Sequence, residues 1–134
     1  MILSQPVVFS ERFMGTLNSL TPSDPEVFHP DALKVYVDQM REMPGVHGMC
    51  EDYRSGATVD LEEQREDIKQ KRKIQCPLMV LWGKKGLVEK KFNAIAEWKK
   101  VSSASVEGEA LDCGHYIPEE APNELLERIK SFFE

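Results

Sequence analysis

The run "PLMVLWG" at residues 77–83 is apolar almost throughout and ends in glycine. Such a continuous run is typical of a strand that is buried on both faces, and strands of this kind belong to parallel sheets. A helix is predicted next, because Phe92, Ile95 and Trp98 recur at helical spacing. The run therefore predicts an α/β fold.

A second strand and a closing helix complete the C-terminal part. "SVEGEAL" at residues 105–111 predicts a weaker strand, and "PNELLERIKSFF" at residues 122–133 predicts an amphipathic helix. The order strand, helix, strand, helix indicates a right-handed βαβα unit with two parallel strands, and functional residues are expected where such strands end. Residues 73–134 are thus predicted to form an α/β segment.

The preceding residues, 1–72, predict a helical segment instead. Its helices are expected at residues 11–20, 30–43, 46–57 and 61–73. The helix at 30–43 is expected to stop at Pro44-Gly45, since proline and glycine end helices. Two parallel strands alone make a marginal sheet with uncovered faces and edges, so we expect that further chain is needed to cover them.

Charge and hydropathy exclude several classes of partner. The chain of 134 residues has 17 basic and 23 acidic residues, a net charge of −6, and its basic run at 69–73 closes an acidic helix. This balance argues against nucleic acid or an anionic membrane as partner. No apolar stretch reaches the ~18 residues of a membrane span and the opening residues lack a signal-peptide pattern, so we expect a cytoplasmic protein.

Cysteine and histidine usage argues against disulfides and metals. Cys50, Cys76 and Cys113 are odd in number and far apart, which favours reduced thiols. Cys and His never occur as CxxC, HxxH or HxxxH pairs. We therefore expect no zinc site.

The stretch "LDCGHYIPEEAP" at residues 111–122 carries a candidate base. His115 follows the second predicted strand, at the position that faces the site crevice in doubly wound sheets, and Gly114 gives the turn its freedom. A histidine in a glycine turn is also compatible with a loop residue that has no chemistry. The single residue does not decide between the two.

Taken together, the motifs point to a family. "PLMVLWG", the helix with "AEWKK", the second strand, "CGHYIPEEAP" and the final helix occur in the order of the C-terminal end of the α/β-hydrolase fold. Upstream, "MCEDYRSGATVDLEEQREDI" resembles the cap segment of the haloacetate (fluoroacetate) dehalogenases. The resemblance runs from about residue 3 to 133 and implies a partial α/β-hydrolase fold, in which residues 1–72 form a helical cap.

The resemblance implies roles for two residues. His115 matches the general base that activates water to hydrolyse a covalent ester, and Tyr53 matches the cap tyrosine that helps to hold the departing halide. Most half-buried tyrosines on helices leave their hydroxyl exposed to water, so the halide-binding role of Tyr53 rests on the surrounding motif alone. Arg54 is interpreted as a surface ion pair, and Glu119 with Glu120 as favouring the following helix N-terminus.

The other members of the family's catalytic triad are not found. In these dehalogenases the nucleophile is an aspartate in a glycine-flanked elbow, and no G-x-[D/S/C]-x-G sequence occurs in these 134 residues. At residues 83–86, after the first strand, Lys84 and Lys85 stand where many hydrolases place the acid. Cys113 lies too close to His115 in sequence to replace the nucleophile. We therefore expect a C-terminal half that is inactive alone and needs an N-terminal half to act on a small haloacid. The reaction that the resemblance implies needs neither a cofactor nor a metal.

Two other hypotheses stay open at this stage. Epoxide hydrolases share the aspartate nucleophile, the histidine base and cap tyrosines that donate to the epoxide oxygen, although "CEDYR" favours the dehalogenases. Alternatively, the chain is a non-catalytic remnant that buries its strand by self-association, so a homo-oligomer is expected if it is stable alone. The halide, and the origin of the chain as a truncation, a misplaced start or a remnant, are left undecided.

Overall fold

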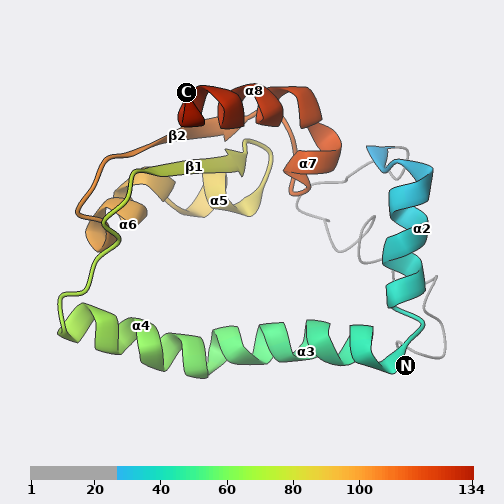
Figure 1. Cartoon of the computed structure of the whole chain (residues 1–134), viewed down its shortest axis with the longest axis horizontal. Helices are drawn as coiled ribbons and strands as arrows, with labels where there is room; N and C mark the ends of the chain where they lie inside the picture. The colour runs from blue at the N-terminus through green and yellow to red at the C-terminus, as the bar shows by residue number, and fades with distance from the viewer. Residues whose placement is uncertain (1–26) are drawn as a thin grey trace.

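The computed structural model describes residues 27–134, and the helix predicted at 11–20 lies outside them. The elements, in chain order, are α2 (Pro30–Gln39), α3 (Met43–Ala57), α4 (Val59–Lys69), β1 (Leu78–Gly83), α5 (Leu87–Lys91), α6 (Ala94–Val101), β2 (Val106–Leu111), α7 (Ile117–Glu120) and α8 (Pro122–Phe133). Figure 1 shows α3 and α4 as a long arm opposite the sheet. The predicted α/β class, with helices followed by a small parallel sheet, is confirmed.

The two strands form the centre of the C-terminal part. They pair in parallel, from Leu78 opposite Val106 to Gly83 opposite Leu111. Helix α8 lies on one face of this sheet, whereas α5 and α6 lie on the other (Figure 1). Both strand ends therefore point toward the same edge of the molecule, where the loops after β1 and β2 meet.

A glycine inside β2 allows the two strands to approach. Gly108 has a φ of 150°, and a Cβ atom built there would lie 1.8 Å from the carbonyl oxygen of Val80 in β1. No larger residue fits this position without moving the backbone of the neighbouring strand. This close approach explains why glycine interrupts an otherwise ordinary strand.

The expectation that β1 is buried on both faces is wrong within residues 27–134. Leu78 to Trp82 are only half-buried, and Gly83 alone is fully buried. The reason is the size of the sheet, because two strands and three helices cover less surface than the sheets in which such apolar runs are normally found. Apolar side chains next to the sheet are also exposed, among them Phe92 between α5 and α6 and Phe133 at the end of α8.

The helical part differs from its predicted boundaries. Helix α2 ends at Gln39, and Pro44 lies in the first turn of α3 rather than at the end of α2. Proline is as well suited to a first helical turn as to a helix end, since its missing N–H has no intrahelical partner there. The short helices α5 and α7 were not predicted. Helix α6 begins at Ala94, so Phe92 of its predicted apolar spacing lies before it, whereas α8 follows its predicted pattern. In the described part of the chain, no helix is long and apolar enough to cross a membrane.

Candidate active site

His115 lies in the turn between β2 and α7, just past the C-terminal end of its strand. The residues before it, Leu111, Cys113 and Gly114, are buried, whereas His115 itself is exposed. The backbone thus anchors the turn and leaves the imidazole accessible. This is the location at which α/β sheets present functional side chains.

The loop after β1 holds the backbone that leads to His115. The N–H of Lys84 donates to the carbonyl of Leu111 at 2.8 Å, and the N–H of Lys85 donates to the carbonyl of Cys113 at 3.0 Å. The Lys85 ammonium also lies 3.3 Å from the carboxylate of Asp112. The "WGKKG" loop, in which no acid was found, therefore supports the His115 turn with its backbone.

Two glycines allow this contact between the loops. A Cβ at Gly83 would lie 1.6 Å from the carbonyl oxygen of Gly114, and a Cβ at Gly114 would lie 2.8 Å from both carboxylate oxygens of Glu120. The end of β1 and the turn are thus packed at backbone distance, and Gly83 has no room for a side chain. At Gly114 a side chain would displace the Glu120 carboxylate.

Glu120 bonds to the backbone on both sides of His115. One carboxylate oxygen accepts from the N–H of Gly114 at 2.5 Å, and the other accepts from the N–H of Tyr116 at 3.0 Å. Charged acceptors make stronger hydrogen bonds than neutral ones. The sequence-based interpretation of Glu120 as a residue that favours the next helix missed this contact.

Glu119 connects the same turn to the helical part. The hydroxyl of Tyr36 in α2 donates to Glu119 at 2.6 Å, and this bond raises the pKa of Tyr36. Beside it, the buried ring of Phe28 packs edge-on against Tyr36 and Tyr116, at centroid distances of 6.4 and 5.2 Å. Helix α2 and the His115 turn are therefore joined by an aromatic cluster and one hydrogen bond.

Tyr53, the predicted halide ligand, projects from α3 and is 66% exposed. Burial raises the pKa of Tyr116, and the nearby Tyr53 phenol raises it further, so these two side chains lie within electrostatic range. The ring of Tyr116 in turn lies 5.2 Å from that of His115. The structure thus places both predicted site residues around Tyr116, which the sequence did not single out; the roles of His115 and Tyr53 stay predictions.

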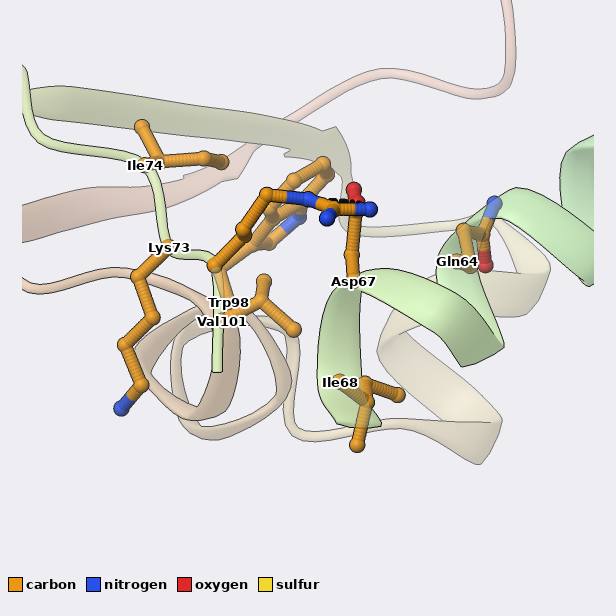
Figure 2. A pocket seen from close by; sticks show the side chains of 8 residues that line it. Gln64, Asp67, Ile68, Lys73, Ile74, Trp98 and Val101 are labelled. Atoms are coloured by element: carbon orange, nitrogen blue, oxygen red, sulfur yellow. Dashed lines mark hydrogen bonds and ion pairs between the residues drawn. The ribbon is translucent and has the colours of Figure 1, made fainter. Parts of the chain in front are cut away.

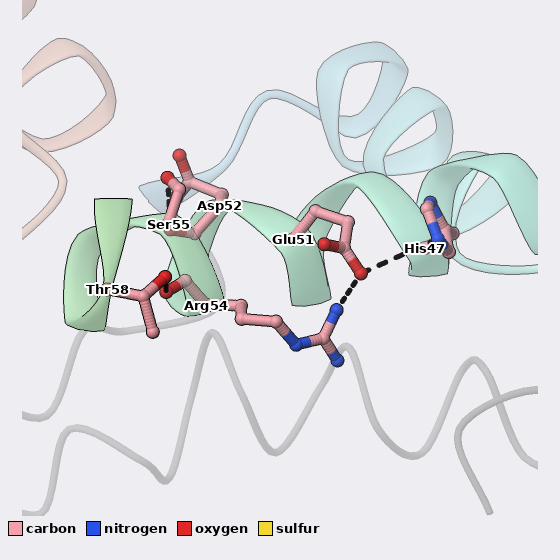
Figure 3. A network of polar contacts seen from close by, with 6 residues as sticks. All are labelled: His47, Glu51, Asp52, Arg54, Ser55 and Thr58. Atoms are coloured by element: carbon pink, nitrogen blue, oxygen red, sulfur yellow. Dashed lines mark hydrogen bonds and ion pairs between the residues drawn. The ribbon is translucent and has the colours of Figure 1, made fainter. Parts of the chain in front are cut away.

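Arg54, next to Tyr53, is engaged on its own helix. Figure 3 shows its guanidinium directed at Glu51, which also lies 3.5 Å from the imidazole of His47. These side chains are largely exposed, and such pairs contribute little to stability. The interpretation of Arg54 as a surface ion pair agrees with this geometry.

Cys113 is poorly suited to act as a nucleophile. Its side chain is 2% exposed, and burial together with the charge of Glu120 raises the pKa of its thiol. A thiol must lose its proton to become nucleophilic, and both effects oppose that loss. Cys113 is a core residue of the turn.

A separate pocket of about 620 Å³ lies away from this turn, between α4 and α6. Figure 2 shows Trp98, Ile74 and Asp67 in its wall. Asp67 pairs with Arg72 at 2.7 Å. Ile74 bridges to Ser102 ahead of β1, at the opposite end of the sheet from His115. Residues 27–134 contain no cluster of three metal-binding side chains there or elsewhere.

Comparison with known proteins supports the fold. No model of a known protein family matches the chain. Fluoroacetate dehalogenase from Burkholderia sp is 27% identical over 146 residues, which cover 97% of this chain and 45% of that protein. Soluble epoxide hydrolase from Corynebacterium sp. (strain C12) is 28% identical, with 94% of this chain and 41% of that protein covered.

A solved structure agrees with these relatives. The crystal structure of ALR0039, a putative alpha/beta hydrolase from Nostoc sp PCC 7120, superposes with a TM-score of 0.83 at 37% identity, covering 98% of this chain and 43% of that one. The chain belongs to the α/β-hydrolase superfamily. It spans less than half the length of the hydrolases it matches, so this α/β-hydrolase chain covers only part of the fold, as the order of its motifs had indicated.

Proposed function

We propose that this chain supplies the base and part of the substrate pocket of a hydrolytic dehalogenase that acts on a small 2-haloacid. The observation that carries the proposal is the accessible His115 in the hydrogen-bonded turn after β2, in a chain similar to a fluoroacetate dehalogenase over 97% of its length. Tyr53 lies within electrostatic range of Tyr116, the residue that follows His115. Soluble epoxide hydrolase aligns over slightly less of the chain.

In the proposed reaction, an aspartate that lies outside residues 1–134 attacks the carbon that bears the halogen. A carbon–oxygen bond forms, the carbon–halogen bond breaks, and the Tyr53 hydroxyl donates to the departing halide. His115 then takes a proton from water as the water oxygen attacks the ester carbonyl, and returns it to the leaving alkoxide. The products are halide, a 2-hydroxyacid, the regenerated aspartate and one proton, which the aspartyl carboxyl group releases.

The first test measures halide release by the chain alone. No elbow sequence for a nucleophile occurs in the 134 residues, so we expect the purified chain to release no halide from chloroacetate or fluoroacetate. Clear turnover by the chain alone would contradict the proposal that its nucleophile comes from elsewhere.

The second test supplies the nucleophile by fusing the N-terminal half of the Burkholderia fluoroacetate dehalogenase to this chain. We expect halide release from the fusion, whereas His115→Asn should give about one equivalent of halide and then stall, with the aspartyl ester visible by mass spectrometry. His47→Asn, an exposed histidine on α3, is the matched control and should turn over normally. A folded fusion that forms neither halide nor ester would contradict the proposed reaction.

Tyr53→Phe in the same fusion tests whether the Tyr53 hydroxyl stabilises the departing halide. Removing one donor to a developing charge commonly costs about 10²–10³ in kcat. The loss should be larger for fluoroacetate than for chloroacetate, because fluoride is the poorer leaving group. An equal loss for both substrates would remove Tyr53 from the halide site.

An epoxide hydrolase is the second candidate, favoured by the Corynebacterium relative and by the proximity of two tyrosines, Tyr53 and Tyr116. Two phenol hydroxyls suit an epoxide oxygen, which must be stabilised as the ring opens. Incubating the fusion with an epoxide such as styrene oxide decides the point, since diol formation without halide release would favour this alternative.

Self-association is the non-catalytic alternative. The half-buried strand β1 and the exposed rings of Phe92 and Phe133 offer apolar surface that a second copy of the chain would cover. We expect a homo-oligomer at micromolar concentration if the chain folds alone. Light scattering that shows a well-folded monomer would contradict it.

A further inference from the structure

We propose that Glu120 is the positioning residue for His115, acting through the backbone on both sides of it. This inference rests on the proposed function in one respect only, the role of His115 as the base. The contact itself is a property of the chain and can be tested without any reaction.

The geometry of the carboxylate is that of a clamp. Its two oxygens accept from the N–H groups of Gly114 and Tyr116, so the residue between them is fixed at both of its peptide neighbours. Glu120 belongs to α7, and its own N–H donates to the carbonyl of Tyr116 at 2.8 Å. The turn and the short helix thus hold each other in place.

The backbone N–H groups on both sides of His115 are bound by the Glu120 carboxylate and not by the loop after β1. The loop after β1 bonds to the carbonyl of Cys113 and to residues before it, but it does not reach beyond His115. The imidazole is exposed, and within residues 27–134 its contact is with the ring of Tyr116. The N–H groups on both sides of His115 bond to the Glu120 carboxylate, while the carbonyl of Tyr116 accepts from the N–H groups of Glu119 and Glu120. The direction of the His115 side chain therefore depends on Glu120 through the backbone, beside its contact with Tyr116.

The chemistry of the clamp predicts how variants differ. Both partners are donors, so a carboxylate satisfies both, whereas the amide of Glu120→Gln presents one oxygen and one NH₂ group. Glutamine can therefore accept one of the two hydrogen bonds through its oxygen. Its NH₂ group faces the other N–H and cannot accept from it. Glu120→Ala removes both bonds.

Glu119 provides the matched control on the same helix. It is the preceding residue and has the same side chain, but it accepts from the hydroxyl of Tyr36. Glu119→Gln changes the same charge at nearly the same place and leaves both N–H groups beside His115 with their partner. Any effect of charge alone would appear in both variants.

The experiment uses the full chain labelled with ¹⁵N and ¹³C. Hydrogen exchange of the Gly114 and Tyr116 amides reports the clamp, and the three-bond couplings of the His115 side chain report its rotamer. In Glu120→Gln we expect one of the two amides to exchange at least about tenfold faster, and in Glu120→Ala both. The His115 couplings should move toward rotamer-averaged values in both variants, while the amide of Val80 in β1 stays protected.

The outcomes separate the clamp from the catalytic role. Unchanged exchange at both amides in Glu120→Ala, or an equal change in Glu119→Gln, would overturn the clamp. Faster exchange with unchanged His115 couplings would show that Glu120 only stabilises the turn, and would overturn the positioning role. If the clamp and the couplings behave as expected but the fusion with His115→Asn still turns over, the proposed function fails and the positioning inference stands.

Discussion

Replacing Gly83 by alanine tests the packing of β1 against the His115 turn. The added Cβ would lie 1.6 Å from the carbonyl oxygen of Gly114, 2.7 Å from its carbonyl carbon and 3.0 Å from the carbonyl oxygen of Cys113. All three atoms belong to the backbone, so no side-chain rotation relieves the contact. The turn must move away from the end of β1, or the strand must break its pairing with Leu111.

The expected cost follows from two opposing terms. Overpacking a filled site lowers the free energy of unfolding by about 1–3 kcal/mol. The atoms that obstruct the new Cβ belong to the backbone and cannot rotate away, so we expect about 3 kcal/mol for Gly83→Ala. Alanine also restricts the unfolded chain, which returns roughly 0.4–1 kcal/mol. The net expectation is a free energy of unfolding lower by about 2 kcal/mol.

Urea unfolding followed by circular dichroism measures this difference. Gly48→Ala is the control, because Gly48 lies inside α3 and a Cβ there meets no atom within 4 Å. Alanine in a helix interior stabilises by roughly 0.5–1 kcal/mol relative to glycine, so this variant should shift the midpoint the other way. The reasoning is refuted if Gly83→Ala unfolds at the wild-type midpoint with unchanged amide shifts at Gly114.

Three further outcomes are expected. Asn93 caps α6 by accepting from the N–H of Ala96 at 3.0 Å, so Asn93→Ala should lower the free energy of unfolding by about 1 kcal/mol in urea titration. The bond to Glu119 raises the pKa of Tyr36 above its ordinary value of about 10, so its stabilisation is complete below that pH and is lost as pH rises through the raised pKa. Spectrophotometric titration of Tyr36→Phe should therefore lose a late-ionising phenol, and an unchanged curve would contradict the bond. Because Cys113 is buried and its pKa is raised, a thiol reagent should modify it well after the other two cysteines, and three equal rates would contradict its burial.

The strongly patterned elements could be predicted from the sequence. Strand β1 is apolar throughout, and helix α8 carries Leu126, Ile129 and Phe133 at helical spacing, so local pattern and final structure agree. The one-turn helices α5 and α7 have too few residues to show a period. Pro44 was assigned to the wrong side of a helix boundary, because proline marks both the end of one helix and the start of the next.

The contacts that form the candidate site could be predicted only in part. The motif around His115 indicated its place after a strand, and the structure agrees, since that position follows from chain order. The bonds from Glu120 to Gly114 and Tyr116 could not be read in advance, because they depend on how the turn folds back. The partial exposure of β1 could not be predicted either. An apolar run indicates that a strand tends to be buried, but it does not show whether neighbouring elements cover both of its faces.

The carboxylates next to His115 in sequence are all engaged elsewhere, which bears on what completes the site. A histidine base needs an acid on its second ring nitrogen to fix its tautomer and to stabilise its charged form. Glu119 accepts from Tyr36, Glu120 from two backbone N–H groups, and Asp112 pairs with Lys85. Using any of these three as the orienting acid would break the contact that it now makes. We therefore expect the acid of a working site to be none of these three.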